Sequence, residues 1–211
     1  MQTETTSTES GFDELLLTRS ILLSHPLAGK VAPGDVLRHV RRYSSVTHWE
    51  ELVCAVINPK AAQLMAIVSI RQPDGYSGIY RRHGSVEYVR FFIDWGEYAG
   101  FQSAGLAHFK VFDSAAKGSD KSRFPVYHLV TTDLDIDRYW ESVLDGMQPK
   151  VRAVLSWNQL PEADVAFTPV FGNQVDSKIC IDSDKVLMNL FEHPKRHEGC
   201  AKFAPGYGSV C

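Results

Sequence analysis

The spacing of apolar residues changes near residue 50. Before it, "FDELLLTRSILLS" (12–24) carries apolar residues at helical spacing, such as Leu15 and Leu22. "DVLRHVRRYSSV" (35–46) begins with Asp35, a residue type that favours the start of a helix. Both segments are predicted to be helices.

Between about residues 50 and 182 the apolar residues alternate with a period of two, which is typical of β-strands. Turn signals such as Asn-Pro and Pro-Asp-Gly separate the alternating runs. The short spacer between the first two runs predicts a hairpin. The predicted strands are 51–58, 63–71, 87–95, 105–113, 124–132, 150–158 and 175–182.

No pattern of helix length separates these strands, so parallel βαβ units are not expected. Two antiparallel sheets packed face to face fit best, as an immunoglobulin-like or jelly-roll-like β-sandwich. The predicted organisation is a disordered tail at 1–10, a helical segment at 11–48, the sandwich at 49–182, and a C-terminal helix and arm at 183–211.

The strand "EYVRFFIDW" (87–95) has its apolar residues at odd positions, with Arg90 and Asp94 together on the even face. These two side chains are predicted to meet opposite charges on neighbouring strands, such as Lys110, and so to fix the register. Further aromatic residues on the even face indicate that a helix or a partner covers it. Trp95 and the similarly placed Trp157 are predicted to pack in the core.

Composition narrows the possible partners. The chain has 211 residues, enough to bury a core without disulfides or metals. Its net charge of −3 gives no general attraction to phosphate backbones, so nucleic acid is not an expected partner. The polar N-terminus does not resemble a signal peptide, and no apolar run suggests a membrane span. A cytoplasmic location is predicted, with signal-less export left open.

The cysteines show no Cys-x-x-Cys spacing, and two of them fall in predicted strands. Buried, reduced thiols are therefore expected. The four residues are Cys54, Cys180, Cys200 and Cys211.

One cluster near the C-terminus has metal-ligand types. His193, His197 and Cys200 are residues that zinc accepts, although Pro194 interrupts the helical turn that would align the histidines. A zinc-binding protein or metal-dependent enzyme is therefore an alternative to a polar arm in which these residues occur by chance. The leading interpretation has no cofactor.

Other sequence motifs of metal-binding and catalytic sites are incomplete or absent. Asp133, Asp135 and Asp137 resemble the start of a calcium-binding EF-hand loop, but Arg138 and Leu144 stand where glycine and glutamate are needed. The chain also lacks G-x-S-x-G, P-loop, G-x-G-x-x-G and H-E-x-x-H motifs. No catalytic residue is predicted.

The sequence supports a role in binding a partner better than it supports catalysis. Arg38 and Arg42 share a face of the second predicted helix. The long loop 72–86 combines tyrosine and arginine, the residue types enriched in binding hot spots. Its candidate partner-binding residues are Tyr76, Tyr80, Arg81 and Arg82.

Residues 50–181 resemble a family of bacterial β-sandwich proteins known mainly as uncharacterised open reading frames. The similar stretches are "ELVCAVINPKAAQLMAIVSIRQPDGYSG", "EYVRFFIDWG", "VRAVLSWN" and "PVFGNQVDSKICI". The resemblance implies a β-sandwich fold, but it implies no particular activity. We therefore expect a non-enzymatic interaction or assembly protein that contacts protein partners or itself through loop 72–86 and the terminal appendages. A carbohydrate-binding module is a second alternative.

Overall fold

Strands form where the two-residue alternation predicts them. The computed structural model describes residues 15–17, 19, 44–58, 61–76, 84–96, 100–114, 121–135, 148–180 and 209–210. The seven predicted strands are β1 (Glu50–Asn58), β2 (Gln63–Ile70), β3 (Ser85–Asp94), β4 (Gln102–Val111), β5 (Val126–Asp133), β6 (Lys150–Trp157) and β7 (Gln174–Cys180). A short β8 (Ser209–Val210) and a 3-10 turn, η1 (Lys121–Arg123), were not predicted.

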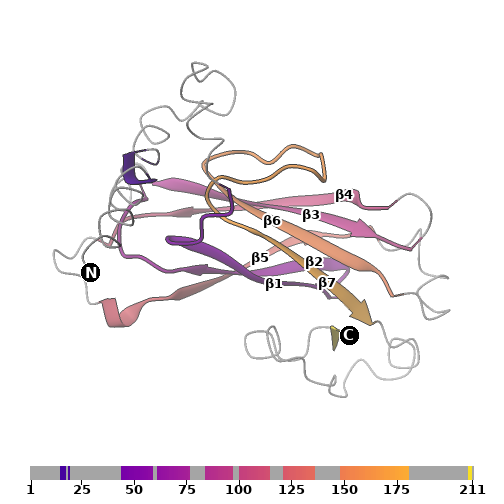
Figure 1. The fold of residues 1–211 in the computed structure, drawn as a ribbon. Helices are drawn as coiled ribbons and strands as arrows, with labels where there is room; N and C mark the ends of the chain where they lie inside the picture. Colours follow the sequence, from indigo (N-terminus) through magenta and orange to yellow (C-terminus); the bar gives the residue numbers. More distant parts are fainter. Residues whose placement is uncertain are drawn as a thin grey trace, which may run out of the picture.

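The strands form two sheets that pack as the predicted sandwich (Figure 1). One sheet has the order β1-β2-β5, and the other has the order β4-β3-β6-β7-β8. All of these neighbouring strands are antiparallel. The hairpin predicted from the first two runs is confirmed as β1-β2, with Asn58 opposite Gln63.

The core follows the alternation on β3 and β6. Val89 lies opposite Leu155 and Phe91 lies opposite Ala153, and all four side chains are buried between the sheets. Burial of such side chains supplies most of the driving force for folding, roughly 1.5–3 kcal/mol for each large one. The predicted burial of two tryptophans is confirmed, and a third, Trp49, is buried with them. The three are Trp49, Trp95 and Trp157.

The even face of β3 is covered by the segment that follows β6. Arg90 Nε donates to the Pro161 carbonyl at 2.9 Å, which links that segment to the strand. Asp94 lies 3.6 Å from Lys150 Nζ, directly across the β3–β6 pair. Asp94 therefore does meet an opposite charge, but its partner is Lys150 of β6 rather than Lys110 of β4.

The predicted helices are only partly within the described residues. Residues 15–17 and 19 are helical, in the first predicted helix. The second prediction is wrong at its end, because residues 44–46 are not helical and Val46 forms a parallel bridge with Phe171. The rest of these segments, the tail at 1–10 and the predicted C-terminal helix lie outside the described residues.

Within the described part of the chain, no helix is long and apolar enough to cross a membrane.

The expectation of reduced thiols is wrong for Cys54. This residue is buried in β1 and is disulfide-bonded. The spacing of cysteines along the chain does not reveal such a bond, because pairing depends on which side chains the fold brings within reach.

Candidate functional site

Three charged side chains are buried at one end of the sandwich. Arg19 comes from the helical residues near the N-terminus, Glu50 begins β1, and Glu87 lies in β3. Their exposed fractions are 2%, 0% and 0%. Charged groups are rarely buried to this degree unless they are paired, so the environment of each one needs a physical account.

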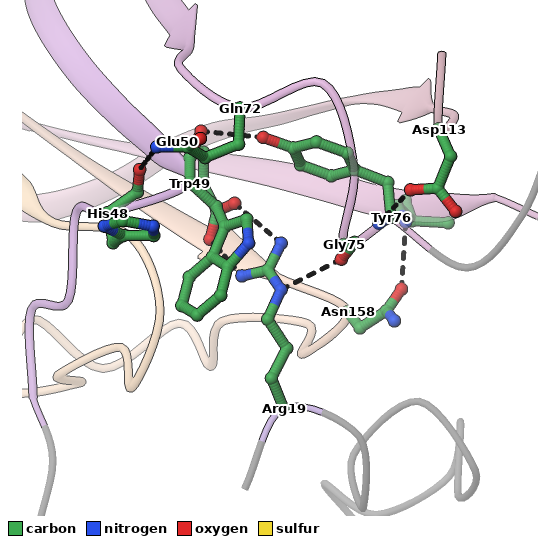
Figure 2. A network of polar contacts seen from close by, with 10 residues as sticks. Arg19, His48, Trp49, Glu50, Gln72, Gly75, Tyr76, Asp113 and Asn158 are labelled. Carbon is green, nitrogen blue, oxygen red and sulfur yellow. Dashed lines mark hydrogen bonds and ion pairs between the residues drawn. The ribbon is translucent and has the colours of Figure 1, made fainter. Parts of the chain in front are cut away.

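Arg19 and Glu50 form a two-point ion pair (Figure 2). Arg19 Nη1 donates to Glu50 Oε1 and Nη2 donates to Oε2, both at 2.9 Å. Arg19 Nε donates to the Gly75 carbonyl at 3.0 Å. All three guanidinium nitrogens are thus engaged, which is the planar match that makes arginine–carboxylate pairs strong.

Aromatic rings surround the guanidinium. Arg19 Cζ lies 3.9 Å from the ring centroid of Trp157 and 4.4 Å from that of Trp49. Phe171 and Tyr76 are further away, at 5.1 and 5.3 Å. A cation at these distances is attracted by the electron-rich ring faces, and more strongly when water is excluded.

We call the groups that contact the Arg19 guanidinium the Arg19 pocket. Its members are Trp49, Glu50, Gly75, Tyr76, Trp157 and Phe171.

The loop after β2 is held in place by bonds that do not involve Arg19. The Tyr76 hydroxyl donates to the Trp49 carbonyl, and the Tyr76 N–H donates to Asp113 Oδ1, both at 2.7 Å. Burial raises the pKa of Tyr76, so the phenol stays protonated as this donor. Gly75 has φ +98°, and a Cβ there would lie 2.6 Å from Trp49 Nε1. Glycine is therefore required for the loop to approach the indole.

Glu87 is the unpaired member of the cluster. It lies opposite Trp157 in the β3–β6 pair, and neither of its carboxyl oxygens forms a well-aligned hydrogen bond in the described structure. Burial raises the pKa of Glu87 well above its usual value, and the charge of Glu50 raises it further, while the charge of Arg19 and the Ser85 hydroxyl group oppose both. Burial therefore favours the neutral, protonated form of Glu87.

The pKa of Glu50 is also set by burial and by the charge of Arg19, which act in opposite directions. Burial raises the pKa of Glu50, and the charge and hydrogen bonds of Arg19 oppose the increase. With Glu87 neutral, Arg19 and Glu50 form a neutral pair inside the core. Such a pair is stable only while both partners are present, because either charge alone would be uncompensated.

The chemistry of this cluster is that of cation recognition. A carboxylate, a carbonyl and four ring faces converge on one planar cation. No group of three or more His, Cys, Asp or Glu side chains that could hold a metal ion occurs in the described residues.

A second feature is the outer strand β5 of the three-stranded sheet. Tyr127 and Leu129, two residues apart on the same face, are 44% and 52% exposed, and the neighbouring Val126 is 41% exposed. We call these three residues the β5 surface. Within the described chain, β5 forms a ladder only with β2.

The opposite edge of the same sheet is closed. The Leu52 N–H donates to Asn173 Oδ1 at 2.7 Å, and Asn173 Nδ2 donates to the Leu52 carbonyl at 3.0 Å. This side chain occupies the backbone groups of β1 that an added strand would use. Of the two outer strands of this sheet, β5 is therefore the one that presents apolar side chains to solvent.

Of the binding and metal residues predicted from the sequence, only Tyr76 lies in the described part of the chain. Tyr76, predicted to contact a partner, is fully buried and lies against Arg19 of the same chain. The remaining predicted binding and metal residues lie outside the described part of the chain. They are Arg38, Arg42, Tyr80, Arg81, Arg82, His193, His197 and Cys200.

Sequence reasoning missed the charged core. Glu87 carried a signal, because it occupies an odd position of a strand whose following odd positions are apolar. A carboxylate on that face predicts a buried acid. Arg19 carried no comparable signal, since nothing local shows that one cation of a leucine-rich segment reaches the core.

Comparison with known proteins adds little. No protein-family profile matches the chain, and no curated protein matches it. Among solved structures, superoxide reductase (neelaredoxin) from Archaeoglobus fulgidus in the reduced form is similar over 62% of this chain and 89% of that one. The identity is 9% and the TM-score is 0.30, values that define no shared function.

Proposed function

We propose that this protein is a non-enzymatic interaction protein whose sandwich binds a partner chain through the β5 surface. The observation that supports this most strongly is the exposure of Leu129 at 52% on an outer strand. Exposed apolar side chains on an outer strand are the usual template for adding a strand from another chain.

A second copy of this chain is the partner that we propose. An outer strand pairs naturally with its own copy about a two-fold axis, in antiparallel orientation, so that one surface serves both subunits. Tyr127 and Leu129, which share one face of β5, would then pack against their copies across the new strand pair. This assignment extends the sequence-based expectation of self-association, but to β5 rather than to loop 72–86.

The test is sedimentation velocity over a wide range of protein concentration. The wild-type protein should shift from monomer to dimer as concentration rises. Leu129→Lys should remain monomeric, because dimerisation would bury an unpaired ammonium group. Leu160→Lys is the matched control, since Leu160 is also exposed, at 48%, but lies on the segment that follows β6. A monomeric wild type, or equal association by Leu129→Lys, would contradict the proposal.

The disulfide at Cys54 bears on the cellular compartment in which this interaction takes place. Disulfides persist in oxidising compartments and are rare in the cytoplasm. We therefore propose that the protein acts in an oxidising compartment rather than in the cytoplasm.

A further inference from the structure

We propose that the Arg19 pocket is a guanidinium-binding site of the sandwich, that Arg19 occupies it as an internal ligand, and that an arginine side chain supplied from elsewhere binds there when Arg19 is absent. This inference does not depend on the proposed function, because the pocket is formed without any residue of the β5 surface.

The pocket is built entirely by the sandwich and its loops. Trp49 and Glu50 stand at the start of β1, Trp157 ends β6, and Phe171 precedes β7. Phe171 contacts both indoles edge-to-face, with centroid distances of 5.7 Å to Trp49 and 5.5 Å to Trp157. The backbone N–H of Trp157 donates to the Phe171 carbonyl at 3.2 Å. These contacts fix the rings without help from Arg19, so the site is preorganised, which reduces the entropic cost of binding.

The geometry selects a guanidinium group over an ammonium group. Glu50 accepts two parallel N–H bonds at 2.9 Å, which only a planar fork can donate together. The third bond goes from Nε to the Gly75 carbonyl. The flat cation also lies within 4.4 Å of two indole centroids. A lysine ammonium offers neither the fork nor the flat face.

Glu87 gives the pocket hydrogen-bonding capacity that Arg19 does not use. Its carboxyl group is buried, its oxygens form no well-aligned hydrogen bond in the described structure, and the charge of Arg19 and the Ser85 hydroxyl group both lower its pKa. A buried acceptor beside a cation site is a position where a ligand with one more donor would gain a bond.

Among the described residues of the helical turn, Leu16 and Leu17 are 42% and 55% exposed, and Leu15 is partly buried against the core. Arg19 is the fully buried side chain of these four described residues. Arg19 lies 31 residues before Glu50 in the chain. Its side chain therefore comes from outside the segments that form the pocket.

The experiment is chemical rescue of Arg19→Ala. Thermal unfolding of this variant is followed by the fluorescence of its tryptophans while n-propylguanidinium chloride is added. At ten times its dissociation constant, a bound ligand contributes about 1.4 kcal/mol, which raises the Tm by about 3–6 °C for a chain of this size. n-Propylammonium chloride and sodium chloride, at the same concentrations, should give no such increase. Wild-type protein should not respond to any of the three.

A second variant shows whether the rescue uses the pocket. Adding Glu50→Gln to Arg19→Ala should abolish the response to propylguanidinium, because the neutral amide cannot accept two charged N–H donors. Acetyl-arginine methylamide should rescue Arg19→Ala like propylguanidinium, and the citrulline analogue should not. If Arg19→Ala does not fold alone, the same comparison is made on the yield of folded protein after refolding with each compound.

Two results would overturn the inference. One is an equal response of the wild type and Arg19→Ala to propylguanidinium, which would indicate a general salt effect. The other is no response of Arg19→Ala in either assay.

Discussion

Arg19 and Glu50 form a two-point ion pair inside the core, through Nη1 and Nη2, and Arg152 and Asp176 form a two-point ion pair at the surface, through Nε and Nη2. The first pair has side chains that are 2% and 0% exposed, and the second has side chains that are 22% and 48% exposed. The protein thus has one buried and one solvated arginine–carboxylate pair, and each pair forms two N–H···O bonds. Burial should decide how much each pair matters for stability.

Replacing Glu87 with glutamine should stabilise the protein at neutral pH. The folded pKa of Glu87 is raised above the ordinary value of 4.5, so its contribution is complete below about pH 4.5 and is lost as pH rises toward the folded pKa. The loss is about 1.4 kcal/mol for each pH unit between the two pKa values. Glu87→Gln removes this titration.

Urea unfolding from pH 4 to pH 8, roughly the range of maximal stability of most proteins, measures the effect. The free energy of unfolding of Glu87→Gln should fall less steeply with rising pH than that of the wild type. Glu51→Gln changes an exposed neighbour of Glu50 and serves as the control. Parallel curves for the wild type and Glu87→Gln would show that Glu87 is not buried as a neutral acid.

Replacing Gly75 with alanine should destabilise the protein more than replacing Gly100. Both glycines have positive φ, +98° and +64°, but only a Cβ at Gly75 meets an atom within 4 Å. Strain at φ alone should cost about 1 kcal/mol in Gly100→Ala. The added clash with Trp49 should bring Gly75→Ala to about 2–4 kcal/mol.

Denaturant unfolding of the two alanine variants provides this comparison. A change in tryptophan fluorescence should accompany Gly75→Ala and not Gly100→Ala, since only the former displaces Trp49. Equal costs for the two variants would mean that the loop does not press against the indole.

Cys54 should react with iodoacetamide only after reduction. The residue is disulfide-bonded, so denaturation alone leaves no thiolate at this position. Peptide mass spectrometry of protein alkylated in denaturant, with and without a reductant, measures this directly. Labelling of Cys54 without reductant would restore the expectation of a reduced thiol.

The sequence predicts the strands well because their signal is local. On β3, Val89, Phe91 and Ile93 share one buried face, while Arg90 and Asp94 lie on the other, and this pattern defines both the strand and its orientation. The sandwich then follows, because two sheets with one apolar face each must cover one another.

The pocket was not predictable because its parts meet only through tertiary structure. Arg19 reaches Glu50 across 31 residues, and Leu52 is bound by Asn173 across 121 residues. No spacing rule relates such pairs. Tyr76 illustrates the reverse error, because a tyrosine in a long loop resembles a contact residue until its hydroxyl is seen to donate to Trp49 inside the molecule.

The most direct test of the buried ion pair as the attachment of the N-terminal turn is a double-mutant cycle. The free energy of unfolding in urea is measured for the wild type, Arg19→Ala, Glu50→Gln and the double variant. The Arg152→Ala and Asp176→Asn cycle is the matched surface control.

Arg19→Ala should cost about 3–5 kcal/mol, because it leaves Glu50 buried without its partner. The coupling energy of the core pair should be about 2–3 kcal/mol, against less than about 1 kcal/mol for the surface pair. Equal coupling in the two cycles would contradict the account, because it would place Arg19 and Glu50 in water rather than in the core.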